Sequence, residues 1–142
     1  MKIYVLGSNS FVKEMVDCRN QLCVLGHEGW IHKDYEDHVR GAARAFIEGA
    51  LPGENADFKR THDYIRQHYQ HILESDAILI VNLEKRGMKN YIGGNCLMEM
   101  GMAYVNNKKI FLLNEIPEEA SYLDEIMAMD PICLRGDLAN ID

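Results

Sequence analysis

The amino-acid sequence predicts an α/β protein, a three-layer sandwich in which helices cover both faces of a five-stranded parallel sheet. Short apolar runs rich in β-branched residues alternate with segments whose apolar residues recur at helical spacing. The clearest run, 77–81, is apolar throughout, which is typical of a parallel strand buried on both faces. The chain contains no internal repeat or low-complexity linker, so residues 1–142 are expected to form one domain. Strand order 2-1-3-4-5 is the usual order for a sheet of this kind.

Each element follows from a local pattern. The first strand ends in Gly7-Ser8-Asn9, small and polar residues that suit the passage into a helix. The segment 61–74 is an amphipathic helix whose apolar stripe is expected to contain Ile65, Tyr69 and Ile72. The expected strands are residues 3–6, 30–32, 77–81, 109–113 and 131–134. The expected helices are residues 11–23, 36–50, 61–74, 96–106 and 121–129.

The composition disfavours several functional classes. The chain has 22 acidic and 15 basic residues and a net charge of −7, which disfavours binding to a nucleic-acid polymer. No apolar run reaches the roughly 20 residues of a membrane span, and the first ten residues do not have the pattern of a signal peptide. The four cysteines lie apart in the sequence, and we expect them to be small buried hydrophobes of a cytoplasmic protein. They are Cys18, Cys23, Cys96 and Cys133.

The ligand site of such a sheet is expected at the carboxyl ends of strands one, three and four. The loops there contain Gly7-Ser8-Asn9, Asn82 and Asn114. Glycine and asparagine suit tight turns and polar contacts, so Gly7, Ser8, Asn9 and Asn82 are candidate substrate-binding residues.

Glu99 is the most informative residue, because it is the only charged residue in the apolar segment 96–105. A helix of that composition is expected to be buried, and an unpaired buried carboxylate costs several kcal/mol. A pocket around Glu99 would compensate this cost. The alternatives are that Glu99 is partly exposed, or that it stabilises the N-terminus of its own helix. The preceding Gly93, Gly94 and Asn95 are candidate binding residues, with Asn95 as the expected N-cap and with free backbone N–H groups at the positive end of the helix.

Several segments resemble the nucleoside 2-deoxyribosyltransferase superfamily, including its 2'-deoxynucleoside 5'-phosphate N-hydrolase branch. The core of the resemblance is Glu-x-Gly-x-Ala at Glu99, Gly101 and Ala103, placed between two apolar strands. The matching segments are residues 3–8, 74–81, 93–104 and 109–113, whereas residues 27–60 match only loosely.

The resemblance implies a flavodoxin-like fold and subunits that complete one another's active sites, hence a homodimer or a higher homo-oligomer. It implies that Glu99 is the nucleophile that attacks C1' of the sugar of a nucleoside or nucleotide, and that Gly7-Ser8-Asn9 lies over the ligand. The chemistry requires no metal and no cofactor.

The chain departs from the family pattern at two positions. His68 stands where relatives usually carry a catalytic aspartate, and Gly93 stands where they carry aspartate or serine. His68 is a candidate acid or base, since imidazole titrates near neutral pH; the alternative is a core or interface histidine. Asp76 is a second candidate, or it accepts backbone hydrogen bonds at the start of its strand. His71 is expected to face solvent.

Three functions are therefore compatible with the sequence. The first is an enzyme that cleaves or exchanges the N-glycosidic bond of a (deoxy)nucleoside or its 5'-monophosphate. The second is a nucleotide-binding module without turnover. The third is an interaction domain without a ligand. A basic loop at 85–90 could contact a phosphate in the first two, or it could be a solvated surface.

Overall fold

The computed structural model of the chain describes residues 1–39 and 53–142, which include a five-stranded sheet. Its strands lie in the order β2-β1-β3-β4-β5, and all neighbouring strands are parallel. The strands are β1 Lys2–Gly7, β2 Glu28–Trp30, β3 Ala77–Val81, β4 Lys109–Leu112 and β5 Ile132–Cys133. The predicted fold class and strand order are confirmed, and the architecture is that of a flavodoxin-like three-layer sandwich.

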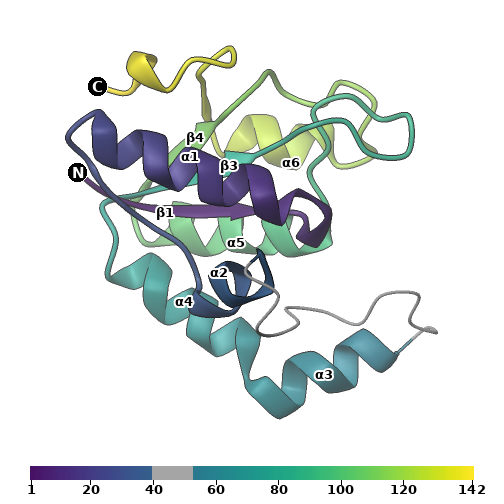
Figure 1. Ribbon diagram of the computed structural model, residues 1–142. Coiled ribbons are helices and arrows are strands. Elements are labelled where there is room, and N and C mark those ends of the chain that lie inside the picture. Colours follow the sequence, from purple (N-terminus) through teal and green to yellow (C-terminus); the bar gives the residue numbers. More distant parts are fainter. Residues whose placement is uncertain (40–52) are drawn as a thin grey trace.

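Helices cover both faces of this sheet, as Figure 1 shows. One face carries α1 and the C-terminal segment, and the other carries α4, α5 and α6. Helix α2 packs against α1, whereas α3 lies next to the start of α4 and away from the sheet (Figure 1). The helices are α1 Val12–Val24, α2 Lys33–Val39, α3 Glu54–His62, α4 Tyr64–Leu73, α5 Gly94–Val105 and α6 Leu123–Ala128.

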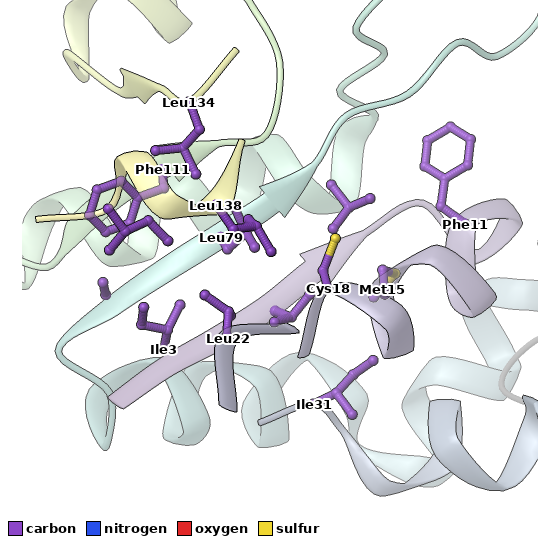
Figure 2. Packing of buried hydrophobic residues seen from close by; sticks show 14 residues of the cluster. Ile3, Phe11, Met15, Cys18, Leu22, Ile31, Leu79, Phe111, Leu134 and Leu138 are labelled. Atoms are coloured by element: carbon purple, nitrogen blue, oxygen red, sulfur yellow. The ribbon is translucent and has the colours of Figure 1, made fainter. Parts of the chain in front are cut away.

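The alternation of side chains along the strands divides the core into two clusters. The first cluster joins Leu79 and Phe111 of the sheet to Met15 and Leu22 of α1, and Leu138 closes it from the C-terminal segment (Figure 2). The second joins the opposite faces of the same strands to α4, α5 and α6. Its members include Tyr4, Ile78, Ile72, Met100 and Ile126. The second cluster is the one that borders the candidate site, because the Tyr4 hydroxyl reaches from it toward α4.

Two predicted helices differ from those observed. The segment 61–74 is two helices, because Asp63 adopts a left-handed conformation (φ 52°) that ends α3 and precedes α4. Aspartate tolerates this conformation better than most residues. The predicted helix 36–50 begins earlier, at Lys33, and is helical to Val39; the rest of that prediction lies outside the described residues. The predicted strand 30–32 is also displaced, and β2 is Glu28–Trp30.

The buried face of α4 differs from the predicted apolar stripe. Ile65 and Tyr69 are exposed, whereas Tyr64, His68 and Ile72 are buried. The buried face thus passes through positions 64, 68 and 72, at a spacing of four residues, and its expected neighbours Ile65 and Tyr69 lie outside it. The prediction for His71 is also wrong in part, since its ring packs edge-on against Trp30 at 4.5 Å and its Nδ1 is buried.

The cysteines occupy three kinds of environment. Cys18 and Cys96 are buried, as expected, and Cys133 is half-buried. The prediction is wrong for Cys23, which is exposed on the last turn of α1, where its Sγ lies 3.6 Å from the Gly29 carbonyl oxygen of β2. No helix among residues 1–39 and 53–142 is long and apolar enough to cross a membrane.

Gly29 of β2 allows α1 to approach the sheet. A Cβ at this position would lie 2.7 Å from the Arg19 carbonyl oxygen and 2.9 Å from Leu22 Cβ. We expect Gly29→Ala to lower the free energy of unfolding by about 2–3 kcal/mol, measured by urea denaturation. The matched control is Gly101→Ala, whose Cβ would meet nothing within 4 Å and which should stabilise α5 by about 0.5–1 kcal/mol. Equal effects of the two substitutions would contradict this account.

Candidate active site

Glu99 lies in the middle of α5 and is 5% exposed. The neighbouring turns of α5 pack Cys96, Met100 and Ala103 against the sheet, and α4 packs beside α5. The carboxyl group is therefore held between two helices, close to the apolar core. The prediction that this carboxylate is buried is confirmed.

His68 of α4 is the closest titratable partner of Glu99. Its Nδ1 lies 3.7 Å from Glu99 Oε1 and 2.7 Å from the Tyr4 hydroxyl. The first distance is longer than a hydrogen bond and the second is a short one. Burial raises the pKa of Tyr4 well above 10, with Glu99 as a smaller cause, so the Tyr4 hydroxyl keeps its proton. Tyr4 thus orients the His68 ring beside Glu99.

The His68 ring is enclosed by other rings. Tyr4, His32 and Tyr35 lie with centroids 5.8, 5.2 and 5.9 Å from it, and Tyr64 lies at 6.3 Å. This packing leaves His68 only 7% exposed. The rings of Tyr35 from α2 and Tyr64 from α4 also line the cavity beside Glu99.

Two hydrogen bonds fix the orientation of the His32 ring. The backbone N–H of Asp34 donates to His32 Nδ1 at 3.1 Å, so this nitrogen carries no proton. His32 Nε2 lies 2.7 Å from Gln67 Oε1 and is the donor to it. These bonds fix the His32 ring beside that of His68, with the ring centroids 5.2 Å apart.

A small cavity adjoins Glu99. Its volume is about 30 Å³, which is on the order of one or two water molecules. His68, Tyr64 and Ile65 line it from α4, and Glu99 and Asn95 from α5. The remaining walls come from other parts of the chain and from the outer side of α5. They are Asn9, Tyr35, Lys59, Met98 and Met102.

Lys59 of α3 closes this cavity toward α5. Its Nζ donates a hydrogen bond of 2.6 Å to Asn95 Oδ1. Burial lowers the pKa of Lys59, and the nearby Glu99 acts in the opposite direction. Lys59 is thus a partly desolvated cation beside the buried carboxyl group.

The ionisation of the central pair follows from its burial. Burial raises the pKa of Glu99 to about 8, although Lys59 acts in the opposite direction. Burial, with His32, His71 and Lys59, lowers the pKa of His68 to about 3. At pH 7 most of the Glu99 is therefore a carboxylic acid, and His68 is neutral. The Glu99 carboxyl group thus holds a proton near neutral pH, and it is a carboxylate only after losing that proton.

The structure brings four of the sequence-predicted residues to this cavity, namely Glu99, His68, Asn9 and Asn95. Asp76 does not belong to this group. It is exposed at the start of β3, and its Oδ2 accepts a hydrogen bond of 2.7 Å from the backbone N–H of Lys2. That contact joins the amino-terminal ends of β1 and β3, at the opposite edge of the sheet. Asp76 therefore accepts a hydrogen bond from the backbone at the start of its strand, which is the second of the two roles considered from the sequence.

Asn82 has a structural role as well. Its side chain is fully buried, donates to the Glu115 carbonyl oxygen at 2.9 Å and accepts from the backbone N–H of Asn114 at 2.9 Å. These bonds tie the carboxyl end of β3 to the loop that follows β4. Both polar groups of Asn82 are therefore engaged within the protein, and the residue does not line the cavity.

The predicted glycines also shape the backbone. A Cβ on Gly7 would lie 3.0 Å from Met15 Sδ, and a Cβ on Gly93 would lie 2.8 Å from the Tyr91 hydroxyl. Ser8 accepts a hydrogen bond of 2.9 Å from Lys85, a residue of the basic loop. None of these three residues lines the cavity.

The start of α5 differs from the prediction. Its N-cap is Gly93, and the helix begins at Gly94. Asn95 is therefore not the N-cap; its side chain is free to accept the Lys59 hydrogen bond. The prediction failed because asparagine favours caps, whereas here the tertiary contact with α3 engages its side chain.

Sequence reasoning missed Lys59, Tyr35 and Tyr64. Lys59 lies in a segment that matches the family only loosely, and its contact with Asn95 spans 36 residues. Tyr64 carried a signal, since it lies four residues before His68 and so on the same face of α4. Its hydroxyl donates to Asp34 in the direction of α2.

Comparisons with known proteins add no assignment. No family model matches the chain, and neither does any curated protein or solved structure. Within the described residues, no three His, Cys, Asp or Glu side chains are placed to hold a metal ion. The functional argument therefore depends on the geometry around Glu99.

Proposed function

We propose that the protein cleaves or exchanges the N-glycosidic bond of a (deoxy)nucleoside or its 5'-monophosphate, with Glu99 as the nucleophile. The single observation that carries this proposal is the buried Glu99 carboxyl group on the wall of a cavity at the carboxyl edge of the sheet. Its pKa, raised to about 8 by burial, leaves roughly a tenth of the groups ionised at pH 7. The resemblance of the segment around Glu99 to nucleoside 2-deoxyribosyltransferases supports the same chemistry.

The chemical steps use few groups. The ionised Glu99 attacks C1' of the sugar, the C1'–N bond breaks, and its electron pair leaves with the base, which takes up a proton from water. Water or a second base then attacks C1' and releases Glu99. Tyr4 orients the His68 ring beside the carboxyl group, and this ring excludes water from one side, while Lys59 favours the ionised form of Glu99.

A sugar is larger than the cavity next to Glu99, so the substrate has to open it. The Lys59–Asn95 hydrogen bond is the connection that must break, because it joins α3 to α5 across the entrance. Asn95 would then be able to contact the sugar hydroxyls. The exposed apolar residues Ile65 and Met98, which also line the cavity, favour a homo-oligomer in which a partner covers them.

The test is incubation with a panel of nucleosides and 5'-monophosphates, with free base measured by chromatography. We expect release by the wild-type protein and a loss of at least about 10³-fold in Glu99→Gln, which keeps the shape but cannot attack C1'. The control is Asp76→Asn, which alters a carboxylate at the other edge of the sheet. Undiminished release by Glu99→Gln would remove Glu99 from the mechanism.

A nucleotide-binding module without turnover is the second candidate. It is favoured by the absence of a second carboxyl group from the cavity wall, as far as the chain is described, and by a His68 whose pKa is lowered to about 3. Near pH 7 such a His68 is a neutral imidazole, whose remaining N–H is too weak an acid to protonate a leaving base. Saturable binding of a nucleotide with no release of base would support this second function over the first.

A further inference from the structure

A groove lies next to the cavity, on the other side of Lys59. Its volume is about 390 Å³, compared with about 30 Å³ for the cavity beside Glu99. The groove runs between α3 and α4 and ends at Asn95 of α5. Lys59, Ile65 and Asn95 line both spaces, so a ligand in the groove reaches the entrance of the cavity.

The groove is cationic although the chain has a net charge of −7. Lys59, Arg60 and Arg66 line it, and Asp63 is the single acidic residue on its wall within residues 1–39 and 53–142. Arg60 pairs with Asp57, and Arg66 NH1 pairs with Asp63 at 3.0 Å. Each guanidinium has five N–H donors, so both arginines keep donors for a ligand.

This charge fits a phosphate monoester. Such a group carries about −1.5 to −2 at pH 7 and has three strong acceptor oxygens. Two arginines and a lysine against the Asp57 and Asp63 carboxylates leave an excess of about one positive charge, which attracts such an anion. Arginine suits this group because its planar fork binds two phosphate oxygens at once.

Lys59 has a position that the arginines lack. Lys59 lines both the groove and the cavity, and it favours the ionised form of Glu99. A phosphate next to Lys59 would compensate the same charge, so the two anions compete for one cation. Binding of the phosphate and ionisation of Glu99 are then linked, and each opposes the other.

We propose that the groove between α3 and α4 is a subsite for a phosphate monoester of the substrate, with Lys59 shared between this phosphate and the Glu99 carboxyl group. The proposal deepens the proposed function and depends on it for the statement that the phosphate belongs to the substrate. It selects 5'-monophosphates over unphosphorylated nucleosides. Ribose 5-phosphate and nucleoside 5'-monophosphates both carry such a phosphate monoester.

Binding of ribose 5-phosphate to the full-length protein, measured by calorimetry against ribose, tests the subsite without any base. We expect binding of the phosphate and not of ribose, with a loss of about fivefold in Arg60→Gln or Arg66→Gln and at least tenfold in the double variant. The matched control is Arg135→Gln, another exposed arginine with an acidic partner, Glu115, which should change affinity less than twofold. Affinity of the double variant within twofold of wild type would overturn the subsite.

The role of Lys59 has its own test. Titration of Glu99, observed by ¹³C NMR of the labelled carboxyl group, should move to higher pH by about half a pH unit when ribose 5-phosphate saturates the protein. Lys59→Met should abolish this movement at a ligand concentration that still saturates. An unmoved wild-type titration would overturn the sharing of Lys59. Within residues 1–39 and 53–142, the titratable groups that face Glu99 are Tyr35 of α2, Lys59 of α3, His68 of α4, Cys96 of α5 and Tyr4 of β1.

The panel of substrates separates this proposal from the proposed function. Binding of ribose 5-phosphate without base release from any compound would support the subsite and contradict the enzyme. Base release at equal kcat/KM from nucleosides and 5'-monophosphates would contradict the subsite and support the enzyme. A monophosphate preference that falls in the Arg60→Gln, Arg66→Gln double variant would support both.

Discussion

Replacing Glu99 by glutamine is expected to stabilise the protein at pH 8 and above by several kcal/mol, and to change its stability little below pH 4.5. Burial raises the pKa of Glu99 from 4.5 to about 8 in the folded state. Between these values the folded protein keeps a proton that the unfolded chain has released, so the free energy of unfolding falls as pH rises. The slope from this group is about 1.4 kcal/mol per pH unit. Glutamine, which resembles the protonated acid in shape, removes the slope.

Urea denaturation of both proteins from pH 4 to 9 gives the comparison. The difference in free energy of unfolding should grow steadily from about pH 4.5 and level off near pH 8. Glu118→Gln is the control, because Glu118 is exposed and its replacement should give a flat difference. A flat difference for Glu99→Gln would mean that the Glu99 carboxylate is hydrated in the folded protein.

The second large effect concerns the rate of base release. If the ionised Glu99 is the nucleophile, kcat/KM should rise about tenfold per pH unit below pH 8 and level off above it. Lys59 favours the ionised form of Glu99, so Lys59→Met should move the whole rise to higher pH. At pH 7 the variant would then be slower, and at pH 9.5 part of the loss would be recovered.

The direction of this pH profile separates two roles of the same residue. A rate that falls with rising pH through pH 8 would show Glu99 acting as a proton donor, since the protonated form would then be the active one. Arg66→Gln serves as the control, because Arg66 lines the groove between α3 and α4 but does not line the cavity beside Glu99. Its profile should keep the midpoint of the wild-type protein.

The fold was predictable because the strong signals are local. β3, with its uninterrupted apolar run, is found at the predicted residues 77–81, and α5 begins at Gly94, two residues before its predicted start. The failures have a tertiary cause. Asp63 breaks a segment that looks continuously helical, because its backbone is left-handed at a position that no periodicity marks.

The candidate site was predictable only in part. Glu99 could be found because a single charge in an apolar helix requires compensation, and the structure confirms its burial. The groups around it come from distant segments: Tyr4 meets His68 across 64 residues, and Lys59 meets Asn95 across 36. Asn82 carried the signal of a binding residue, but it connects two loops instead. A polar residue at the end of a strand can satisfy the backbone as well as a ligand.

Direct titration of Glu99 is the measurement on which this account depends most. With glutamate labelled at its side-chain carboxyl carbon, and Glu99→Gln used to assign the resonance, ¹³C NMR from pH 4 to 10 reports the ionisation of this one group. The structure predicts a midpoint near 8, because the carboxyl group is enclosed between α4 and α5. A midpoint near 4.5 would show that water reaches the carboxylate freely, and the proposed nucleophile would lose its buried site.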